Sequence, residues 1–378
     1  MRRPIAVGVT LAMSALPSYA EIANAPAPQQ RSQVKVETVA KGLVHPWALQ
    51  FLPDGDMLVT ERPGRMRLVG KDGKLSAPLA GVPAVVAEGQ GGLLDVALAP
   101  DFATSRQIFF SYSEPRGRGT NGTAVARARL VGEGDGGRLE DVTAIFRQEP
   151  ATSGGLHFGS RLAFARDGTL FVTLGERFEK SFAQDLSRHW GKVVRIATDG
   201  KAPPDNPFVG RAGARPEIWS FGHRNPQSAA IHPATGKLWT VEHGARGGDE
   251  INIPEKGKNY GWPVISYGVD YSGAKIGEGT RKAGMEQPIY YWDPSIAPCG
   301  MAFYTGDEIP AWKGNLFVGA LAHQHVSRLV LDGEKVVAEE KLLTDLRARI
   351  RDVRSGPDGA LYVLTDSPQG RVLRVRGL

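Results

Sequence analysis

The chain has 378 residues, a formal net charge of +6 and a single cysteine, Cys299. One cysteine excludes an internal disulfide framework, and a small, scattered basic surplus without a Lys/Arg run argues against a nucleic-acid-binding surface. Glycine is abundant, with 47 residues, and long helical periodicity is absent, so we expect a large all-β protein. No segment is suited to crossing a membrane.

The N-terminus has the features of an export signal, residues 1–20. Arg2 and Arg3 give a short basic start, the stretch from Ile5 to Leu16 is apolar, and small residues flank a cleavage site after it. Residues 21–33 are rich in Pro, Ala and Gln and are expected to form a flexible lead-in. We therefore expect a periplasmic or secreted protein.

One strand–turn–strand signal then recurs along the chain. Its clearest copy, Trp47 to Gly70, contains an apolar strand, a Pro-Asp-Gly turn, a second apolar strand, a polar bend and a third strand. Asp-Gly between alternating apolar runs is a strong hairpin signal. The six copies begin at Trp47, Gly92, Ser160, Gln227, Gly300 and Asp352.

A spacing of roughly 45 to 75 residues suits a four-stranded blade with inserted loops. The sequence therefore predicts one domain, residues 34–378, folded as a six-bladed β-propeller. We expect Val34 to Leu43 to add an outer strand to the last blade and so close the ring.

Polar motifs lie at the inner ends of these copies, and in a propeller the loops there meet at one end of the central channel. They are EGQGGLLDVAL around Gln90, GLHFGSRL around His157, LGERF around Glu176, SFGHRNPQ around Arg224, EHGARGGDEINIPEKGKNYGWP from Glu242, DPSIAPCG around Ser295 and RIRD around Arg351. Together they resemble the soluble dehydrogenases of aldoses and glucose that depend on pyrroloquinoline quinone (PQQ), which are six-bladed propellers. The resemblance runs from about Gly42 to the C-terminus, and GHRNPQ and GGDEIN…KNYGWP are its most specific parts.

The resemblance implies that His157 is the general base. Oxidation of a sugar hydroxyl needs a group with a pKa near neutral to accept the proton as hydride leaves carbon. Glu176 matches the family's carboxylate that orients this imidazole and stabilises its protonated form. Arg224 would stabilise negative charge that builds on the quinone oxygens.

The resemblance also implies a set of PQQ contacts. Arg349 and Arg351 flank Ile350 on a predicted strand, so both should point the same way, where they would repel unless an anion lies between them. The family pairs them with the carboxylates of PQQ. The implied cofactor-binding residues are Gln90, Arg224, Asn225, Arg349 and Arg351.

Ca²⁺ is the second implied cofactor, because it binds carboxylates and backbone carbonyls in flexible arrays. One ion would sit on the carbonyls of Gly244 and Ala245, beside PQQ. Zinc is not expected, since there is no HExxH or CxxC. The positions that match the family's structural Ca²⁺ are Asp249, Glu250, Tyr260 and Asp270.

Three positions depart from the family pattern. Leu156 stands where the family has an acid before the histidine, and Ala322 and His323 stand near the place of a lysine that contacts PQQ. Asp293 aligns with an aromatic residue that covers the substrate in the glucose branch. These departures leave PQQ affinity and the preferred sugar open.

Three functions follow as hypotheses. The first is oxidation of an aldose at its anomeric carbon to a lactone, with electrons passing to a separate acceptor because the chain has no haem-attachment CxxCH. The second is a Ca²⁺-dependent hydrolase such as a lactonase, which would have no use for the paired arginines. The third is a non-catalytic propeller that binds a sugar or a protein on its loop face.

Overall fold

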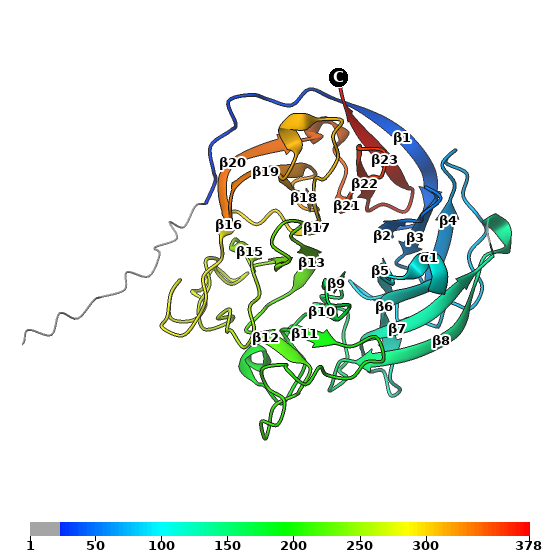
Figure 1. The fold of residues 1–378 in the computed structure, drawn as a ribbon. Coiled ribbons are helices and arrows are strands. Elements are labelled where there is room, and N and C mark those ends of the chain that lie inside the picture. Colours follow the sequence, from blue (N-terminus) through cyan, green and yellow to red (C-terminus); the bar gives the residue numbers. More distant parts are fainter. Residues whose placement is uncertain (1–22, 133) are drawn as a thin grey trace, which may run out of the picture.

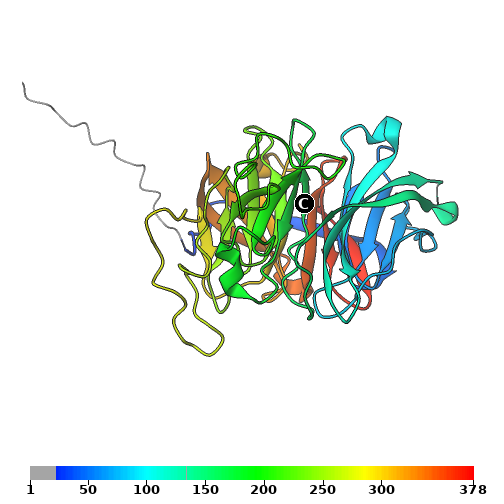
Figure 2. The ribbon, with the colours of Figure 1, turned by 90° about the horizontal axis from the view of Figure 1, so that it is seen from below.

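The computed structural model describes residues 23–132 and 134–378, so the expected export signal lies outside the described residues. The described strands form six antiparallel sheets arranged as blades around a central axis (Figure 1). Seen from the side, the molecule is a disc whose blades stand next to one another (Figure 2). The predicted six-bladed β-propeller is confirmed.

Each blade is numbered here in chain order, and its strands run outward from the central axis. The inner strands, β2, β5, β9, β13, β17 and β21, lie at or beside the starts of the six repeats. Blade 1 has β2 (Pro46–Phe51), β3 (Met57–Glu61) and β4 (Arg65–Val69), and blade 2 has β5 (Leu93–Leu98), β6 (Gln107–Pro115), β7 (Asn121–Val131) and β8 (Arg138–Arg147). Blade 3 has β9 (Leu162–Phe164), β10 (Leu170–Leu174), β11 (Lys192–Ile196) and β12 (Ile218–Phe221), and blade 4 has β13 (Pro226–Ile231), β14 (Leu238–Glu242), β15 (Asp249–Asn252) and β16 (Tyr290–Trp292). Blade 5 has β17 (Pro298–Phe303), β18 (Leu316–Ala320), β19 (Val326–Asp332) and β20 (Lys335–Leu342), and blade 6 has β21 (Ile350–Ser355), β22 (Leu361–Thr365) and β23 (Gly370–Gly377).

The ring closes between the two ends of the described chain. Strand β1 (Val34–Leu43) pairs antiparallel with β23 and becomes the outer strand of blade 6, as predicted. Leu43 is fully buried and packs in a cluster that joins Leu49 of blade 1 to Val372 of blade 6. Closure therefore combines a strand pairing with a hydrophobic seam.

Helices contribute little to this fold, and among the described residues no helix has both the length and the apolar composition to cross a membrane. They are α1 (Phe102–Ser105) and the short 3₁₀ turns η1 (Gly134–Gly136), η2 (Lys180–Gln184), η3 (Pro310–Trp312) and η4 (Thr344–Leu346).

The segment expected to be a flexible lead-in, residues 21–33, is anchored where the structure describes it. The N–H of Ala25 donates to the Tyr290 hydroxyl at 3.1 Å, and the N–H of Ser32 donates to the Glu340 carboxylate at 2.7 Å. The chain thus runs along blades 4 and 5 before it reaches β1 (Figure 1).

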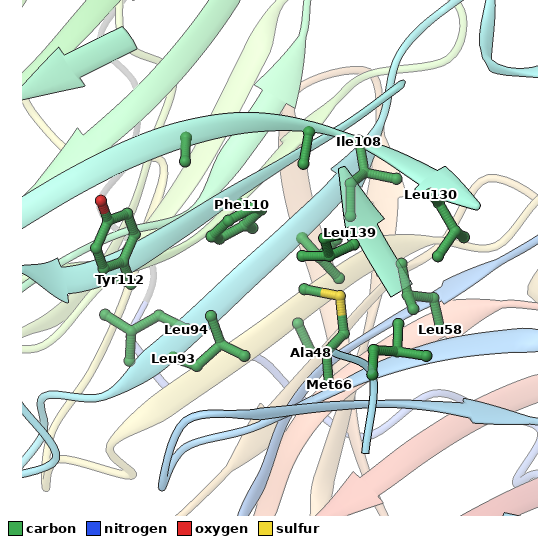
Figure 3. Packing of buried hydrophobic residues seen from close by; sticks show 14 of the residues in the cluster. Ala48, Leu58, Met66, Leu93, Leu94, Ile108, Phe110, Tyr112, Leu130 and Leu139 are labelled. Atoms are coloured by element: carbon green, nitrogen blue, oxygen red, sulfur yellow. The ribbon is translucent and has the colours of Figure 1, made fainter. Parts of the chain in front are cut away.

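The hydrophobic core lies between neighbouring blades, because each sheet presents an apolar face to the next. Between blades 1 and 2, for example, Leu58 and Met66 meet Leu94 and Phe110, all of them buried (Figure 3). Alternation along each strand places these side chains, so the repeated apolar strands of the sequence already specify the packing.

A buried polar cluster occupies the centre of the propeller, and we call it the hub. The Arg161 guanidinium pairs with Asp95 at 3.2 Å and with Asp352 at 3.1 Å, and it stacks 4.1 Å from the centre of the Trp47 ring. It also donates to backbone carbonyls of blades 4 and 6 and approaches the thiol of blade 5. The hub residues are Trp47, Asp95, Arg161, Gln227, Cys299, Arg351 and Asp352.

Bulges help to aim side chains at the hub. The ladders of β2, β5, β13, β17 and β21 each shift register near the start of the strand. A bulge leaves one residue unpaired and redirects its side chain, and Trp47, Gln227 and Arg351 are such residues. Five blades therefore supply side chains or carbonyls to the guanidinium of the sixth.

Candidate functional site

His157 and Glu176 form a buried pair at the channel end of blade 3. His157 lies in the loop before β9, and Glu176 lies just after β10, the neighbouring strand. Nδ1 of His157 is 2.8 Å from a carboxylate oxygen of Glu176, and both side chains are nearly fully buried. The described residues offer Nε2 of His157 no hydrogen bond, so this nitrogen is the one left for a substrate.

The environment keeps the His157 imidazole neutral near pH 7. Burial lowers its pKa below the ordinary value of 6.5, and this outweighs the hydrogen bond and negative charge of Glu176, which raise it. The nearby charges of Arg224 and Arg177 lower the pKa further. A neutral imidazole with one nitrogen oriented by a carboxylate can act as a general base.

Close backbone packing sets the position of this base. A Cβ on Gly175 would come within 2.1 Å of the His157 carbonyl oxygen, so only glycine lets the end of β10 approach this loop. Oε1 of Gln90 accepts from the His157 N–H at 2.9 Å, and Oδ1 of Asn225 accepts from the Gly159 N–H at 3.0 Å. Three loops therefore hold the imidazole from separate sides.

Arg224 and Asn225 join this network from the loop before β13. The Arg224 carbonyl accepts from the Glu176 N–H at 2.9 Å, which ties the two loops together. The Arg224 guanidinium donates to the Gly244 carbonyl at 2.5 Å and contacts the Tyr271 hydroxyl at 3.2 Å. Nε of Arg224 and Nδ2 of Asn225 are buried and have no hydrogen-bond partner among the described residues. Such donors indicate a site for a ligand rich in oxygen acceptors.

Blade 4 contains a second histidine–glutamate pair with the same separation in sequence. Nδ1 of His223 lies 2.9 Å from Glu242, nineteen residues later, just as Glu176 follows His157 by nineteen. The difference lies at the other ring nitrogen: Nε2 of His223 contacts the Ser220 hydroxyl at 2.8 Å, and its ring stacks on buried Tyr260. In the blade 4 pair both ring nitrogens of the histidine thus have partners, whereas in the blade 3 pair Nε2 has none among the described residues. We call the blade 4 pair sealed.

The side chains of Arg349 and Arg351 converge, as the sequence predicts. The anion between them is a carboxylate of the protein itself. Asp366, which follows β22, contacts Arg351 at 2.5 Å, Arg349 at 3.8 Å and the imidazole of His45 at 2.8 Å. Burial by itself would raise the pKa of Asp366, but Arg351 and His45 outweigh it and hold that pKa well below its usual range. Arg351 is buried in the hub, whereas the Arg349 side chain is 47% exposed.

The pKa of His243 responds to the charged groups of this region. Burial lowers its pKa to about 3, and the charges of Arg224, His157 and Arg351 also disfavour its protonated form. Its Nε2 is 2.8 Å from the carbonyl oxygen of Pro298. The base, the blade 4 arginine and the blade 6 arginine therefore all act electrostatically on His243.

The residues proposed for calcium fall into two groups, around Gly244 and around Asp270. Asp249 accepts from Ser295 and from the N–H groups of Gly244 and Ile296, so its oxygens are already used. Asp270 lies on the loop after β15, 3.8 Å from Lys180. The described residues contain no group of three His, Cys, Asp or Glu side chains arranged to hold a metal ion.

Three of the calcium candidates lie together beside Arg224. Gly244, Glu250 and Tyr260 line a small cavity of about 10 Å³ together with Glu242. Burial, then the charge of Glu242, raises the pKa of Glu250 to about 8. The Tyr260 hydroxyl, by contrast, donates to the Ile253 carbonyl at 2.5 Å, so its side chain is engaged.

An open cavity of about 350 Å³ adjoins the base. Glu176 and Arg224 form part of its wall, and the loop after β10, the loop between β14 and β15 and the loop after β15 form the rest. A separate cavity of about 400 Å³ near Trp219 and Arg195 contains none of the predicted site residues. We therefore place the candidate active site at the first cavity. Its lining residues are Glu176, Phe178, Glu179, Lys180, Ser181, Arg224, Ala245, Trp262, Asp270 and Tyr271.

Two site residues escaped prediction from the sequence. Asp366 carries a detectable signal, since an acid also follows the second strand of other blades, at Glu61 and Glu176. Arg177 carries none: it is buried and donates to the carbonyls of Leu156 at 2.9 Å and Gly154 at 2.6 Å, which brace the loop that bears His157.

Comparisons with known proteins agree with this geometry. A family model described as glucose/sorbosone dehydrogenase matches residues 43–374. The aldose sugar dehydrogenase YliI of Escherichia coli K12 is 53% identical over 345 residues, which cover 90% of this chain and 92% of that protein. A crystal structure of a glucose dehydrogenase superposes with a TM-score of 0.88 at 55% identity and covers 90% of this chain and 99% of that one.

A more distant structure shows a cofactor. The PQQ-bound aldose sugar dehydrogenase of Streptomyces coelicolor superposes with a TM-score of 0.75 at 28% identity, covering 93% of this chain and 100% of that one. The family match spans nearly the whole propeller, and two relatives above 50% identity are sugar dehydrogenases. The chain belongs to the glucose/sorbosone dehydrogenase family, a family of oxidoreductases.

Proposed function

We propose that this protein oxidises aldose sugars at the anomeric carbon to lactones with PQQ and Ca²⁺, and passes the electrons to a separate acceptor. The observation that carries the proposal is the His157–Glu176 pair beside a cavity whose wall includes Arg224. His157 takes the sugar hydroxyl proton at Nε2 as hydride leaves the anomeric carbon. Glu176 orients the ring and stabilises the imidazolium that forms.

The residues present fit PQQ. Its carboxylate and quinone oxygens are acceptors, and the buried Nε of Arg224 and Nδ2 of Asn225 are donors without partners among the described residues. When bound, PQQ would supply the two-electron acceptor for the hydride. Arg349 is half exposed and would exchange its bond to the Leu321 carbonyl for one to a PQQ carboxylate, and Gln90 borders the base. Arg351 would act on PQQ electrostatically, through the charge that it shares with Asp366.

The second part of the proposal is that Ca²⁺ binds beside Arg224. The carbonyl oxygens of Gly244 and Ala245 suit a hard cation, and a cation bound there would favour the ionised form of the nearby Glu250, whose pKa burial raises. In the present arrangement the Arg224 guanidinium occupies the Gly244 carbonyl, so this side chain must turn when a cation binds there. We keep Asp249, Tyr260 and Asp270 as weaker candidates for structural ions because their side-chain oxygens already have partners.

Reconstitution tests the function directly. Purified protein is titrated with PQQ and Ca²⁺, and dye reduction is followed with a panel of aldoses. We expect PQQ binding and turnover, both lost with a chelator and restored by Ca²⁺. His157→Ala should abolish turnover while PQQ stays bound, because it removes only the base. Failure to bind PQQ, or full turnover by His157→Ala, would refute this assignment.

We also propose that the protein is exported. The support is the basic and apolar pattern of residues 1–20. Expression of the full chain in a bacterium, followed by periplasmic extraction and N-terminal sequencing, should show a mature form that begins near residue 21. A full-length chain confined to the cytoplasm would contradict this.

A further inference from the structure

The cavity beside the base carries two aromatic side chains that remain exposed. Phe178 is 55% exposed and Tyr271 is 60% exposed, and they are the two aromatic residues among the exposed large hydrophobic residues of the described chain. Both line the cavity of about 350 Å³. Exposed apolar surface gathered in one cavity indicates a contact site for a ligand.

The loop that presents Phe178 is held in an unusual conformation. Arg177 and Phe178 both have left-handed backbones, with φ of 59° and 66°, which costs non-glycine residues of the order of 1 kcal/mol each. The Phe178 N–H donates to the Glu176 carboxylate, so the oriented base and the aromatic ring share one anchor. Strain of this kind persists only where surrounding contacts maintain it.

Two buried cations fix the ends of this loop. At its start, Arg177 donates to the carbonyls of Leu156 and Gly154. At its far end, the Lys192 ammonium donates to the carbonyls of Phe182 and Ala183, each at 3.0 Å. Because both ends are tied to the propeller, the Phe178 ring is a preorganised surface.

The ring of Phe178 stands next to the proposed base. Its centre is 5.2 Å from the centre of the His157 ring, in an edge-to-face arrangement of 70°. The sealed pair in blade 4 offers a comparison: His223 also has an aromatic partner, Tyr260, but that ring is only 6% exposed. Of these two histidines, only His157 has an aromatic neighbour that a ligand can reach. It is also the one whose Nε2 has no hydrogen-bond partner among the described residues.

We propose that Phe178 is a specificity-determining residue on which the C–H face of a pyranose ring packs, with Tyr271 as a second aromatic residue of the same cavity. This inference rests on the proposed sugar oxidation. Pyranoses with several equatorial hydroxyls present an unbroken patch of axial C–H groups, which the negative face of an aromatic ring attracts. An axial hydroxyl at C2 or C4 interrupts the H2/H4 face, which lies opposite the H1 that leaves as hydride from a β-pyranose. Phe178 packed on this face should favour glucose over its C2 and C4 epimers.

The matched variants are Phe178→Leu, which keeps an apolar side chain and removes the flat ring, and Phe178→Tyr, which keeps the ring. Phe178 is largely exposed, so both should fold and keep the PQQ affinity of the wild type, measured by titration of the apo-protein. For Phe178→Leu we expect a rise in KM for glucose of about fivefold to tenfold, a smaller change in kcat and a weaker preference over galactose. Phe178→Tyr should remain close to the wild type.

A binding measurement without turnover completes the test. The probe is 1,5-anhydroglucitol, a pyranose without an anomeric hydroxyl, and calorimetry should show about fivefold to tenfold weaker binding to Phe178→Leu. Unchanged KM, sugar preference and probe affinity in Phe178→Leu would refute the packing of the sugar on Phe178 but would not affect the proposed sugar oxidation. No turnover of any aldose by the reconstituted wild type would refute the sugar oxidation, and with it the role of Phe178.

Discussion

At the scale of single residues, the two histidine–glutamate pairs show how a repeated feature becomes a site. Both histidines direct Nδ1 at a carboxylate nineteen residues later. Ser220 and Tyr260 close off His223, and no described residue caps Nε2 of His157. The chemical difference therefore comes from what surrounds the second ring nitrogen and not from the pair itself.

Glu176→Gln should separate the two effects of this carboxylate on His157. Loss of its negative charge makes the imidazole easier to deprotonate, so the pKa falls further below 6.5 and the acid limb of kcat/KM moves to lower pH. At pH 7, kcat should drop by roughly 100-fold because the imidazolium that forms is no longer stabilised. The measurement is a pH–rate profile.

Glu179→Gln is the control for that profile, since Glu179 is exposed and lines the same cavity without contacting the imidazole. Its acid limb should coincide with that of the wild type. An acid limb for Glu176→Gln at or above the wild-type position would show that the pair does not set the pKa of His157.

Asp366 is the second residue whose charge can be tested. Asp366→Asn leaves Arg351 buried without its anion, so the free energy of unfolding should fall by about 3 kcal/mol at pH 7. The folded-state pKa is depressed, so this contribution is fully present above the unfolded value of about 3.9 and is lost progressively as the pH falls from there through the folded-state pKa.

Urea unfolding at pH 7 and at about pH 3 measures that difference. Asp307→Asn, which removes an 83% exposed carboxylate, should change stability little at either pH. A loss for Asp366→Asn that stays constant between the two pH values would contradict the ionic origin of the effect.

At the scale of elements, the closing strand β1 is the feature that the sequence predicts and the structure confirms. Its pairing with β23 unites residues more than 300 positions apart, and Leu43 fills the seam between blades 6 and 1. The repeat pattern made this inference feasible, because only a strand from before the first copy could supply the fourth strand of the last blade.

Leu43→Ala should lower the free energy of unfolding by about 3 kcal/mol, since it leaves a cavity at a fully buried site. Lys41→Ala, an exposed change on the same strand, should have little effect. Equal stability of the two variants in chemical denaturation would mean that the seam does not contribute to closure.

At the scale of the whole molecule, Arg161 connects the blades. Its guanidinium lies among groups from blades 1, 2, 4, 5 and 6, so one buried cation contacts all the other blades. Asp95 is fully buried beside it; burial raises its pKa, and the charges of Arg161 and Arg354 counter that rise in part.

Arg161→Gln should therefore destabilise the protein by about 3 to 5 kcal/mol, because the buried Asp95 and Asp352 would share Arg354 as their one remaining paired cation among the described residues. Arg129→Gln breaks a surface ion pair with Glu140 and should cost less than about 1 kcal/mol. Thermal unfolding of the two variants compares them, and similar losses would argue against a stabilising hub.

The sequence by itself determined the blade count and the closing strand, because Asp-Gly turns, strand alternation and repeat spacing are local signals. The His157–Glu176 pair was expected from the resemblance to the dehydrogenase family. Only the tertiary structure decided how Asp366 lies between two arginines, how Arg161 gathers the hub and how Phe178 comes to rest beside His157. These arrangements depend on loops from blades far apart in sequence and on left-handed turns without a glycine signal. Whether an arginine meets a protein carboxylate or a ligand is set by which loops converge, and strand periodicity does not contain that information.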